Sequence, residues 1–272
     1  VSHNTAGATF RACGKNRKRN TSLSSAAIAG ATTLSIADST GWESGDRIVI
    51  DSDTEDPARA QVVTISGSGP NWTVSPALTI ARASGTLVGN LSSNVSFAAF
   101  DAARPAVHTH YVNDANGAVR LRHVSFVNVG NNTGWVGGSQ NNPGYYGSFG
   151  VRNALAPSVY ARSCATETTS SAVAGAGPAT YGHGRNKSFF IDWAIYAGTS
   201  AGGFYPCGNS TSGIYESTIY RAGAAVNSQF DGGAVAGEMV GCNTCASSAT
   251  TIAINNITSF KVTGGVHKSA VR

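Results

Sequence analysis

The chain has 272 residues, of which 41% are apolar, 12% are charged and 33 are glycines. This apolar content excludes an intrinsically disordered chain, and the scarcity of helix-favouring residues argues against a helical bundle. The net charge is +5, but four positive charges belong to the single run 15–19. No aromatic residue is interleaved with that run, so we predict no nucleic-acid partner.

Residues 1–30 are polar and basic and show no clear periodicity, so we interpret them as a lead-in. Its basic run predicts a solvated loop, with a processing site or a contact to an anionic polymer as alternatives. No apolar stretch is long enough to cross a bilayer, and we expect no membrane insertion. Because the pattern is still running at Arg272, we expect the chain to be a piece of something longer.

Residues 31–100 alternate short apolar runs with clusters of turn-forming residues, which predicts an antiparallel β meander. Trp42 is expected to pack on this module as an anchor. The predicted strands are Thr33–Ile36, Arg47–Ile50, Ala60–Ile65 and Trp72–Ile80.

Residues 101–272 contain repeated strand-like runs whose starts lie about 25 to 40 residues apart, a spacing typical of solenoids. The runs are Val119–Val129, Ser158–Cys164, Ser188–Tyr196, Gly213–Tyr220 and Thr250–Phe260. Each is rich in β-branched and aromatic residues and lacks helical periodicity. We interpret them as coils of a parallel β-helix, in which each rung buries its inward side chains by stacking on its neighbours.

The module resembles the eight-glycine domain of cell-surface hyaluronan-degrading proteins, fibrocystin-like proteins and relatives on bacterial and phage surfaces. The matching segments are Thr33-Leu-Ser-Ile, Thr40-Gly-Trp, Gly45-Asp-Arg-Ile-Val-Ile, Val62-Val-Thr-Ile-Ser-Gly and Trp72-Thr-Val-Ser-Pro-Ala-Leu. In that family a right-handed parallel β-helix follows, and 119–130 looks like its first coil. The fold class we predict is therefore all-β: a small antiparallel β module leading into a right-handed, pectate-lyase-like parallel β-helix.

The resemblance covers roughly residues 30–130 and concerns architecture more than activity. Enzymatic members are expected to carry histidines and acids soon after the first coil, whereas 135–147 contains none. We therefore favour a non-enzymatic chain and leave catalysis open.

A polysaccharide lyase or glycoside hydrolase is the alternative reading. Gly182-His183-Gly184 is similar to a polygalacturonase motif and 190–193 to a pectate-lyase motif, but the accompanying acid pair and histidine are missing. Glycoside hydrolysis needs two carboxylates about 5–10 Å apart. The candidates are Asp192, Glu216 and Asp231, with His183, and Asp192 and Glu216 would face each other on adjacent rungs.

Aromatic residues in glycine-rich loops indicate a sugar-stacking surface, a subunit interface or local loop packing. They are Trp135, Tyr145, Tyr146, Tyr181, Phe204 and Tyr205. A glycan-binding module without chemistry is therefore a further alternative.

The remaining motifs concern cysteines, histidines and sequons. Cys242 and Cys245 form a lone Cys-x-x-Cys, a candidate disulfide rather than a zinc site. His108, His110 and His123 lack acidic partners, so we expect no metal and no cofactor. Asn-x-Ser/Thr sequons favour an extracellular glycoprotein; they begin at Asn20, Asn71, Asn90, Asn94, Asn131, Asn186, Asn209 and Asn256.

Together these features predict a structural or adhesive component of an extracellular assembly, such as a virion tail or fibre or a cell-surface filament. The expected partners are other copies or subunits of that assembly, together with carbohydrate. The expected location is extracellular, on a virion or a cell surface.

Overall fold

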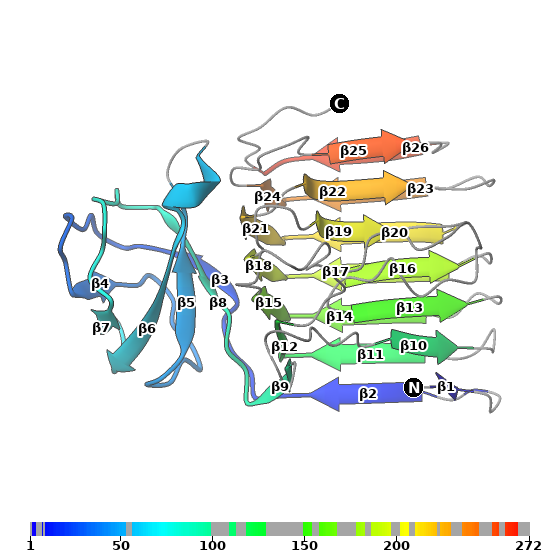
Figure 1. The fold of residues 1–272 in the computed structure, drawn as a ribbon, viewed down its shortest axis with the longest axis horizontal. Coiled ribbons are helices and arrows are strands. Elements are labelled where there is room, and N and C mark those ends of the chain that lie inside the picture. The colour runs from blue at the N-terminus through cyan, green and yellow to red at the C-terminus, as the bar shows by residue number, and fades with distance from the viewer. Residues whose placement is uncertain are drawn as a thin grey trace.

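In the computed structural model, a stack of parallel strands carries a small antiparallel sheet on one side (Figure 1). The structure describes residues 2–3, 7, 9–52, 56–98, 109–112, 118–128, 149–153, 158–167, 178–182, 186–196, 202–206, 210–221, 224–229, 236–244, 252–255 and 259–265. Within these ranges the one helical element is the short 3-10 helix η1 (Pro57–Arg59). None of the described segments is a helix with the length and apolarity needed to span a membrane. The predicted all-β class is confirmed.

Three parallel sheets form the solenoid, and each full coil contributes one strand to each sheet. Sheet 1 contains β1 (Ser2–His3), β10 (Thr109–Val112), β13 (Phe149–Asn153), β16 (Pro178–Gly182), β19 (Gly202–Pro206), β22 (Ala224–Gln229) and β25 (Ile252–Asn255). Sheet 2 contains β2 (Thr9–Cys13), β11 (Ala118–Arg122), β14 (Ser158–Arg162), β17 (Asn186–Ile191), β20 (Ser210–Tyr215), β23 (Ala236–Val240) and β26 (Ser259–Thr263). Sheet 3 contains β9 (Val95–Ala98), β12 (Val124–Val127), β15 (Ala165–Glu167), β18 (Ala194–Tyr196), β21 (Thr218–Arg221) and β24 (Asn243–Thr244).

The solenoid core follows from the period-two pattern of these strands. Val119 and Leu121 of β11 are fully buried, and Arg120 between them is exposed. Stacked aromatic rings run through the interior. The ring centroids of Phe97 and Phe126 are 5.3 Å apart, and those of Phe126 and Trp193 are 6.1 Å apart. Each aromatic ring buries about 150–250 Å², so this column holds successive rungs together.

A column of sharp bends separates sheet 2 from sheet 3. The bend residues are His123, Ser163, Asp192, Glu216, Gly241 and Gly264, with φ between 49° and 66°. The backbone N–H of each of the first five donates to the next rung, as from Asp192 to the carbonyl of Tyr215 at 2.9 Å. The residue after the bend turns inward, as buried Cys164 and Trp193 illustrate. Several predicted runs are therefore two strands joined by a left-handed residue.

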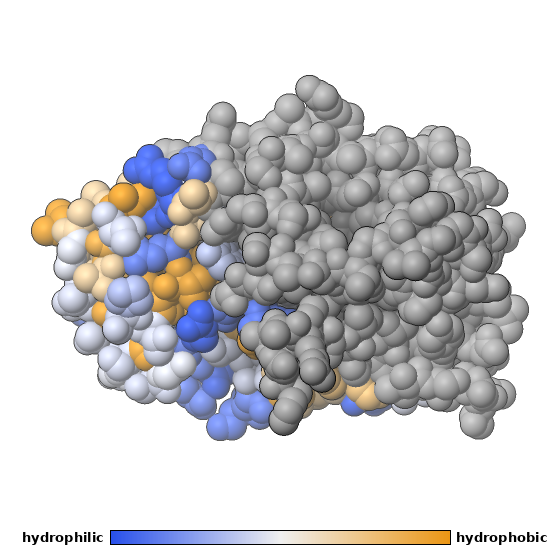
Figure 2. Space-filling model, in the orientation of Figure 1, coloured by the Kyte–Doolittle hydropathy of each residue, from blue (hydrophilic) through white to orange (hydrophobic). Residues whose placement is uncertain are grey.

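The module sheet has the order β3 (Asn20–Ser22), β8 (Leu87–Asn90), β5 (Arg47–Ile50), β6 (Gln61–Gly67), β7 (Asn71–Ser75) and β4 (Thr33–Ser35). All its pairings are antiparallel. The predicted meander holds for β5, β6 and β7, but β4 pairs with β7 at the sheet edge. Trp42 is 7% exposed and its ring lies 6.4 Å from that of Trp72. The module face seen in Figure 2 mixes polar and apolar residues.

The strand pairings divide the chain differently from the expected ranges 1–30, 31–100 and 101–272. Strand β2 pairs in parallel with β11, and β9 pairs in parallel with β12, so both belong to the solenoid. The module therefore lies within the first coil, between β2 and β9. The lead-in interpretation was wrong for 9–13, because that segment finds its hydrogen-bond partners more than a hundred residues along the chain.

The module packs against sheet 3 through a buried apolar cluster. Val49 and Leu91 of the module side meet Ala165, Ala194 and Tyr220 of the solenoid. Beside this cluster, the Arg47 guanidinium and the buried Glu167 carboxylate form an ion pair. Both contacts hold the module to the side of the stack.

Candidate functional site: an arginine face on the solenoid

Four arginines lie side by side on the outer face of sheet 2. Arg11 of β2 is in register with Arg120 of β11, and Arg122 of β11 is in register with Arg162 of β14. Adjacent strands are about 4.8 Å apart, and residues two positions apart in a strand share a face. We call this set, Arg11, Arg120, Arg122 and Arg162, the arginine face.

The arginine face is open to solvent. All four side chains are exposed, while the intervening Val119, Leu121, Val159 and Ala161 are buried. None of the ion pairs found among the described residues involves these arginines. They are therefore free to meet an external anion.

Like charges placed opposite each other on neighbouring strands destabilise a sheet. Here two such pairs follow one another on three consecutive rungs. An arrangement that breaks a local rule of sheet stability in this way is a candidate functional site. Arginine's planar fork pairs with carboxylate, sulfate or phosphate oxygens, and each such contact would relieve the repulsion.

Partly buried apolar residues continue the face beyond the arginines. Tyr160 is in register with Arg120, and Phe189 and Ile191 are in register with Tyr160 and Arg162. All three are intermediate in exposure. The face therefore changes along the solenoid from a cationic area to a mixed apolar one.

The bend residue His123 reports the electrostatic potential beside this face. Burial lowers the pKa of its imidazole, and the positive charges of Arg19, Arg122 and Arg162 lower it further. His123 is 8% exposed. The imidazole therefore favours its neutral form next to the cationic surface.

The acids proposed for an enzymatic alternative do not converge in the described residues. Asp192 and Glu216 do occupy bends on adjacent rungs. However, the Asp192 carboxylate accepts hydrogen bonds from Ser163 Oγ at 2.8 Å and Asn20 Nδ2 at 3.0 Å. It thus contacts the preceding rung and the module, while Glu216 is exposed. Asp231 and His183 lie outside the described residues.

The aromatic candidates divide into two groups. Tyr181 lies in β16, and Phe204 and Tyr205 lie in β19, so the expectation that these three occupy loops was wrong. The reason is parallel pairing in sheet 1, where Tyr181 is in register with Arg152 and Tyr205 with Ala179. Trp135, Tyr145 and Tyr146 lie outside the described residues, and their proposed contacts stay predictions.

Cys242 is a free thiol inside the solenoid core, where it is 2% exposed. Burial raises its pKa to about 11, and its Sγ contacts the carbonyl of Ile214 at 3.2 Å. The predicted disulfide with Cys245 is therefore absent at Cys242, because the bend at Gly241 turns the next side chain inward. Cys245 lies outside the described residues.

At two of the predicted glycosylation positions, the asparagine side chain makes a hydrogen bond within the protein. The amide nitrogen of Asn90 donates to Asp46 at 2.9 Å, and that of Asn20 donates to Asp192. A glycan could not be attached to either nitrogen in this fold. Asn71 and Asn94 are exposed and remain candidates. Asn186 lies in β17, with its side chain not described; Asn131, Asn209 and Asn256 lie outside the described residues.

The remaining histidine candidates give no metal site in the described part. His110 lies in β10, paired with Val151, while His108 lies outside it. Across the described residues, no group of three or more His, Cys, Asp and Glu converges on one point.

The arginine face was not recognised from sequence. Its members come from three segments that are far apart in the chain, and each contributes one or two charges. A signal was nevertheless present in Val119-Arg-Leu-Arg, where alternation puts both arginines on the face opposite the core. Only the register between coils adds Arg11 and Arg162 to them.

No protein-family model matches the chain, and no curated protein matches its sequence. The resemblance to the eight-glycine domain therefore stays a prediction. Solved structures with partial similarity include bacteriophage tailspikes. The tailspike Gp54 of Acinetobacter baumannii bacteriophage AP22, solved with A. baumannii capsular saccharide, is 12% identical, with 95% of this chain and 58% of that chain covered and a TM-score of 0.25.

Two Pseudomonas phage tailspikes give similar values. For gp49 of phage LKA1 the identity is 11%, the coverage 96% of this chain and 64% of that chain, and the TM-score 0.26. For gp61 of phage phi297 the identity is 12%, the coverage 99% of this chain and 62% of that chain, and the TM-score 0.25. The chain spans between 58% and 64% of the length of these tailspikes.

Proposed function

We propose that the chain is a structural and adhesive component of an extracellular assembly, a virion tail or fibre or a cell-surface filament, and that its arginine face contacts an acidic polysaccharide. The observation that carries the proposal is the register of Arg11 with Arg120 and of Arg122 with Arg162 on one exposed face. The resemblance of the module to domains of cell-surface and phage-surface proteins points in the same direction.

The scaffold suits a structural role. Coils that stack only on their neighbours form a straight, stiff body whose length grows with each rung. The module is held to this body by buried contacts, including fully buried Arg19 and Tyr220. Such a body presents a flat face at a constant orientation, which favours contact with an extended chain.

The chemistry of the face favours a polyanion with repeated charges. Arginines on strands about 4.8 Å apart can each pair with a separate carboxylate or sulfate. A duplex groove is read by a helix or a β ribbon that enters it, and single-stranded nucleic acid needs exposed aromatic platforms. The flat face with partly buried Tyr160 and Phe189 fits an acidic polysaccharide better than either.

The test is binding of the purified chain to immobilised hyaluronan and alginate, with neutral dextran as the comparison. Replacing Arg11, Arg120, Arg122 and Arg162 together by Gln should weaken binding between about 4-fold and about 1,000-fold, because each of the four exposed charge contacts contributes about 0.2–1 kcal/mol. Binding by the wild type should fall steeply as NaCl is raised. Arg59→Gln removes one exposed charge on the module and should have no effect.

Three outcomes would overturn the glycan contact: equal binding by the quadruple variant, equal retention on dextran, or tighter binding to single-stranded DNA than to either polyanion. The assembly itself is tested by electron microscopy of the native source with a labelled antibody. Label on a repeating filament or virion supports a structural component. Label on free monomers alone contradicts it.

A further inference from the structure

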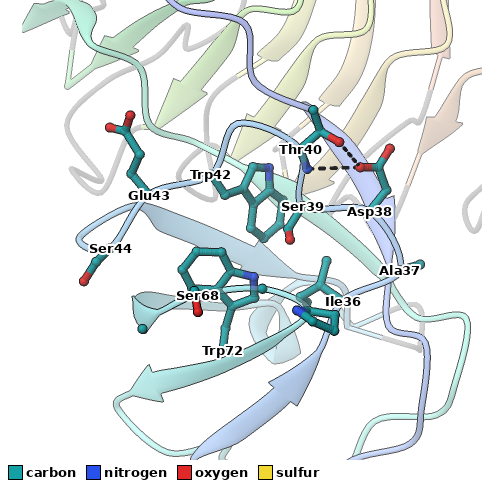
Figure 3. A pocket seen from close by; sticks show the side chains of 13 residues that line it. Ile36, Ala37, Asp38, Ser39, Thr40, Trp42, Glu43, Ser44, Ser68 and Trp72 are labelled. Carbon is teal, nitrogen blue, oxygen red and sulfur yellow. Dashed lines mark hydrogen bonds between the residues drawn. The ribbon is translucent and has the colours of Figure 1, made fainter.

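A hollow of about 440 Å³ lies on the module, between the segments around Ile36–Ser44 and Gly67–Trp72 (Figure 3). This volume is within the range of small-molecule pockets, about 300–1,000 Å³. Trp42, Trp72 and Ile36 supply its apolar lining, and Ser39 lies beside the two indole rings. The hollow is on the module, whereas the arginine face is on sheet 2 of the solenoid.

One polar group lining this hollow has no partner. Trp72 is 3% exposed, and its Nε1–H makes no hydrogen bond. The other described tryptophans behave differently: Trp42 Nε1 donates to the carbonyl of Lys18 at 2.7 Å, and Trp193 Nε1 donates to Thr166 Oγ1 at 3.1 Å. An unsatisfied buried donor costs about 1–3 kcal/mol. The indole N–H of Trp72 therefore has the capacity to donate a hydrogen bond to an acceptor atom of a ligand.

Gly69 and Ser39 flank this donor, whose nitrogen is itself buried. A Cβ atom at position 69 would collide with Ser39 Oγ and lie 3.1 Å from Trp72 Nε1. The Ser39 hydroxyl therefore fills the space beside Gly69, and a ligand reaches the indole N–H when that hydroxyl rotates aside. A ligand oxygen placed in that space can accept from Trp72 and bond with Ser39.

The charges around the hollow are largely balanced within the protein. The Glu43 carboxylate pairs with Arg17 at 2.7 Å and with Lys15 at 3.3 Å. Asp38 accepts from the Thr40 backbone N–H at 3.0 Å and from its hydroxyl at 2.7 Å (Figure 3). These hydrogen bonds lower the pKa of Asp38, which stays ionised at neutral pH as an acceptor. An uncharged ligand rich in hydroxyl groups fits this setting.

We propose that the hollow binds a neutral saccharide unit carrying an acetamido group. The acetamido carbonyl oxygen accepts from Trp72 Nε1–H, and its methyl group packs on the apolar lining near Ile36. The sugar hydroxyls bond with the polar rim, where Asp38, Ser39 and Ser68 lie. An amide carbonyl is a stronger acceptor than a hydroxyl, and for that reason an N-acetylated sugar is favoured over a plain hexose.

The test follows the indole N–H resonances in ¹H–¹⁵N NMR spectra of the whole chain. Methyl N-acetylglucosaminide should shift the Trp72 resonance downfield, as expected for a new hydrogen bond, and leave that of Trp193, in the solenoid core, in place. Trp72→Phe identifies the resonance. Methyl glucoside should bind at least about fivefold more weakly, because it leaves the indole donor without its amide acceptor. N-methylacetamide, which lacks the sugar, should bind more weakly still.

Gly69→Ala is the blocking variant, since its methyl group fills the space beside Trp72 and the Ser39 hydroxyl can rotate away. A ¹H–¹⁵N spectrum that matches the wild type away from the hollow would establish that it folds, and the same sugar should then bind at least about fivefold more weakly. A Trp72 resonance unmoved by the acetamido sugar overturns the proposal, as does full binding by Gly69→Ala. Equal binding of methyl glucoside overturns the acetamido contact, and equal binding of N-methylacetamide overturns the saccharide. Because methyl N-acetylglucosaminide is uncharged, its binding is tested independently of polyanion binding by the arginine face.

Discussion

Arg19 and Ser163 lie 144 positions apart in the sequence, yet the Arg19 guanidinium donates twice to the Ser163 carbonyl, from Nε at 3.1 Å and Nη2 at 2.9 Å. Arg19 is fully buried. Its Nη1 also donates to the carbonyls of Asn90 at 2.7 Å and Ser92 at 2.8 Å. Burial lowers the pKa of Arg19 to about 10, so the side chain remains charged at neutral pH. One arginine therefore bonds the module to a bend of the solenoid.

Replacing Arg19 by Met should destabilise the protein strongly. The change removes the donors to three buried or part-buried carbonyls while keeping an apolar stem of similar length. Leaving such acceptors unsatisfied costs about 1–3 kcal/mol for each group, so we expect the free energy of unfolding to fall by roughly 3–5 kcal/mol. Urea denaturation measures it. Arg59→Met, at an exposed position, is the control, and equal stability of both variants would contradict the role of Arg19.

Gly89→Ala should disturb the junction from the module side. The new Cβ would lie 2.5 Å from Cε2 of Tyr220 and 2.9 Å from its Oη. Tyr220 is fully buried and donates to Asn20 Oδ1 at 3.0 Å, so it has little room to move. Overpacking of this kind costs about 1–3 kcal/mol.

A double-mutant cycle with Tyr220→Leu isolates this contact. In the Tyr220→Leu background the ring is gone, and Gly89→Ala should cost less than half as much free energy of unfolding. An equal cost in both backgrounds would mean that the strain arises elsewhere.

Asp192 should make stability depend on pH in the acid range. Burial raises the pKa of its carboxyl above the ordinary 3.8, against the opposing hydrogen bonds from Ser163 and Asn20. The folded state therefore holds this proton more tightly than the unfolded state. The resulting stabilisation is complete below pH 3.8 and is lost as the pH rises through the folded-state pKa.

Asp192→Asn removes this titration, and asparagine tolerates the left-handed backbone at position 192, where φ is 51°. We expect the wild type to lose stability relative to Asp192→Asn as the pH is raised from 3 to 7, measured by denaturation at each pH. Glu216→Gln, which removes a carboxylate at the exposed bend of the next rung, is the matched control for the loss of one charge. A difference that does not change with pH would refute the assignment.

His123 should respond to the arginine face. Its pKa is lowered first by burial and then by Arg19, Arg122 and Arg162. Removing two of these charges in Arg122→Gln/Arg162→Gln should raise the pKa of His123 towards its ordinary value, because the imidazolium then meets less repulsion. NMR titration of the imidazole C–H resonance measures the shift. As the control, Arg59→Gln should leave the pKa of His123 unchanged. An unchanged pKa of His123 in the double variant would contradict the proposed interaction with Arg122 and Arg162.

Local sequence patterns predict several of the strands that the structure contains. In 47–50 and 61–65 the apolar runs between turn formers marked module strands, and the alternation around Val119 and Leu121 marked a rung. The bends were harder to see, since His123, Asp192 and Glu216 have no local signature for a left-handed backbone. The sequence pattern does not predict strand β23, because Ala236–Val240 contains glycine and glutamate and has no strong apolar alternation.

The basic run 15–19 shows why composition alone misleads at a junction. It was interpreted as a solvated loop, but Arg17 is 4% exposed and Arg19 is fully buried. Arg17 pairs with Asp46 and Glu43 on the module. Buried charges are rare and need partners. Arg17 meets its partners when the module folds, whereas Arg19 meets Ser163 only when the module has docked on the solenoid.

The sequence by itself determined the all-β class, four strands of the module and several rungs of the solenoid, because period-two alternation is a local property of each segment. Tertiary structure decided that residues 9–13 join the solenoid, that Arg19 is buried between the module and the solenoid, and that Arg11 and Arg162 flank Arg120 and Arg122. Register between parallel strands depends on how whole coils stack, and no short window of sequence contains that information. The arginine face is a product of that stacking, and the hollow beside Trp72 is a product of the packing of two segments within the module.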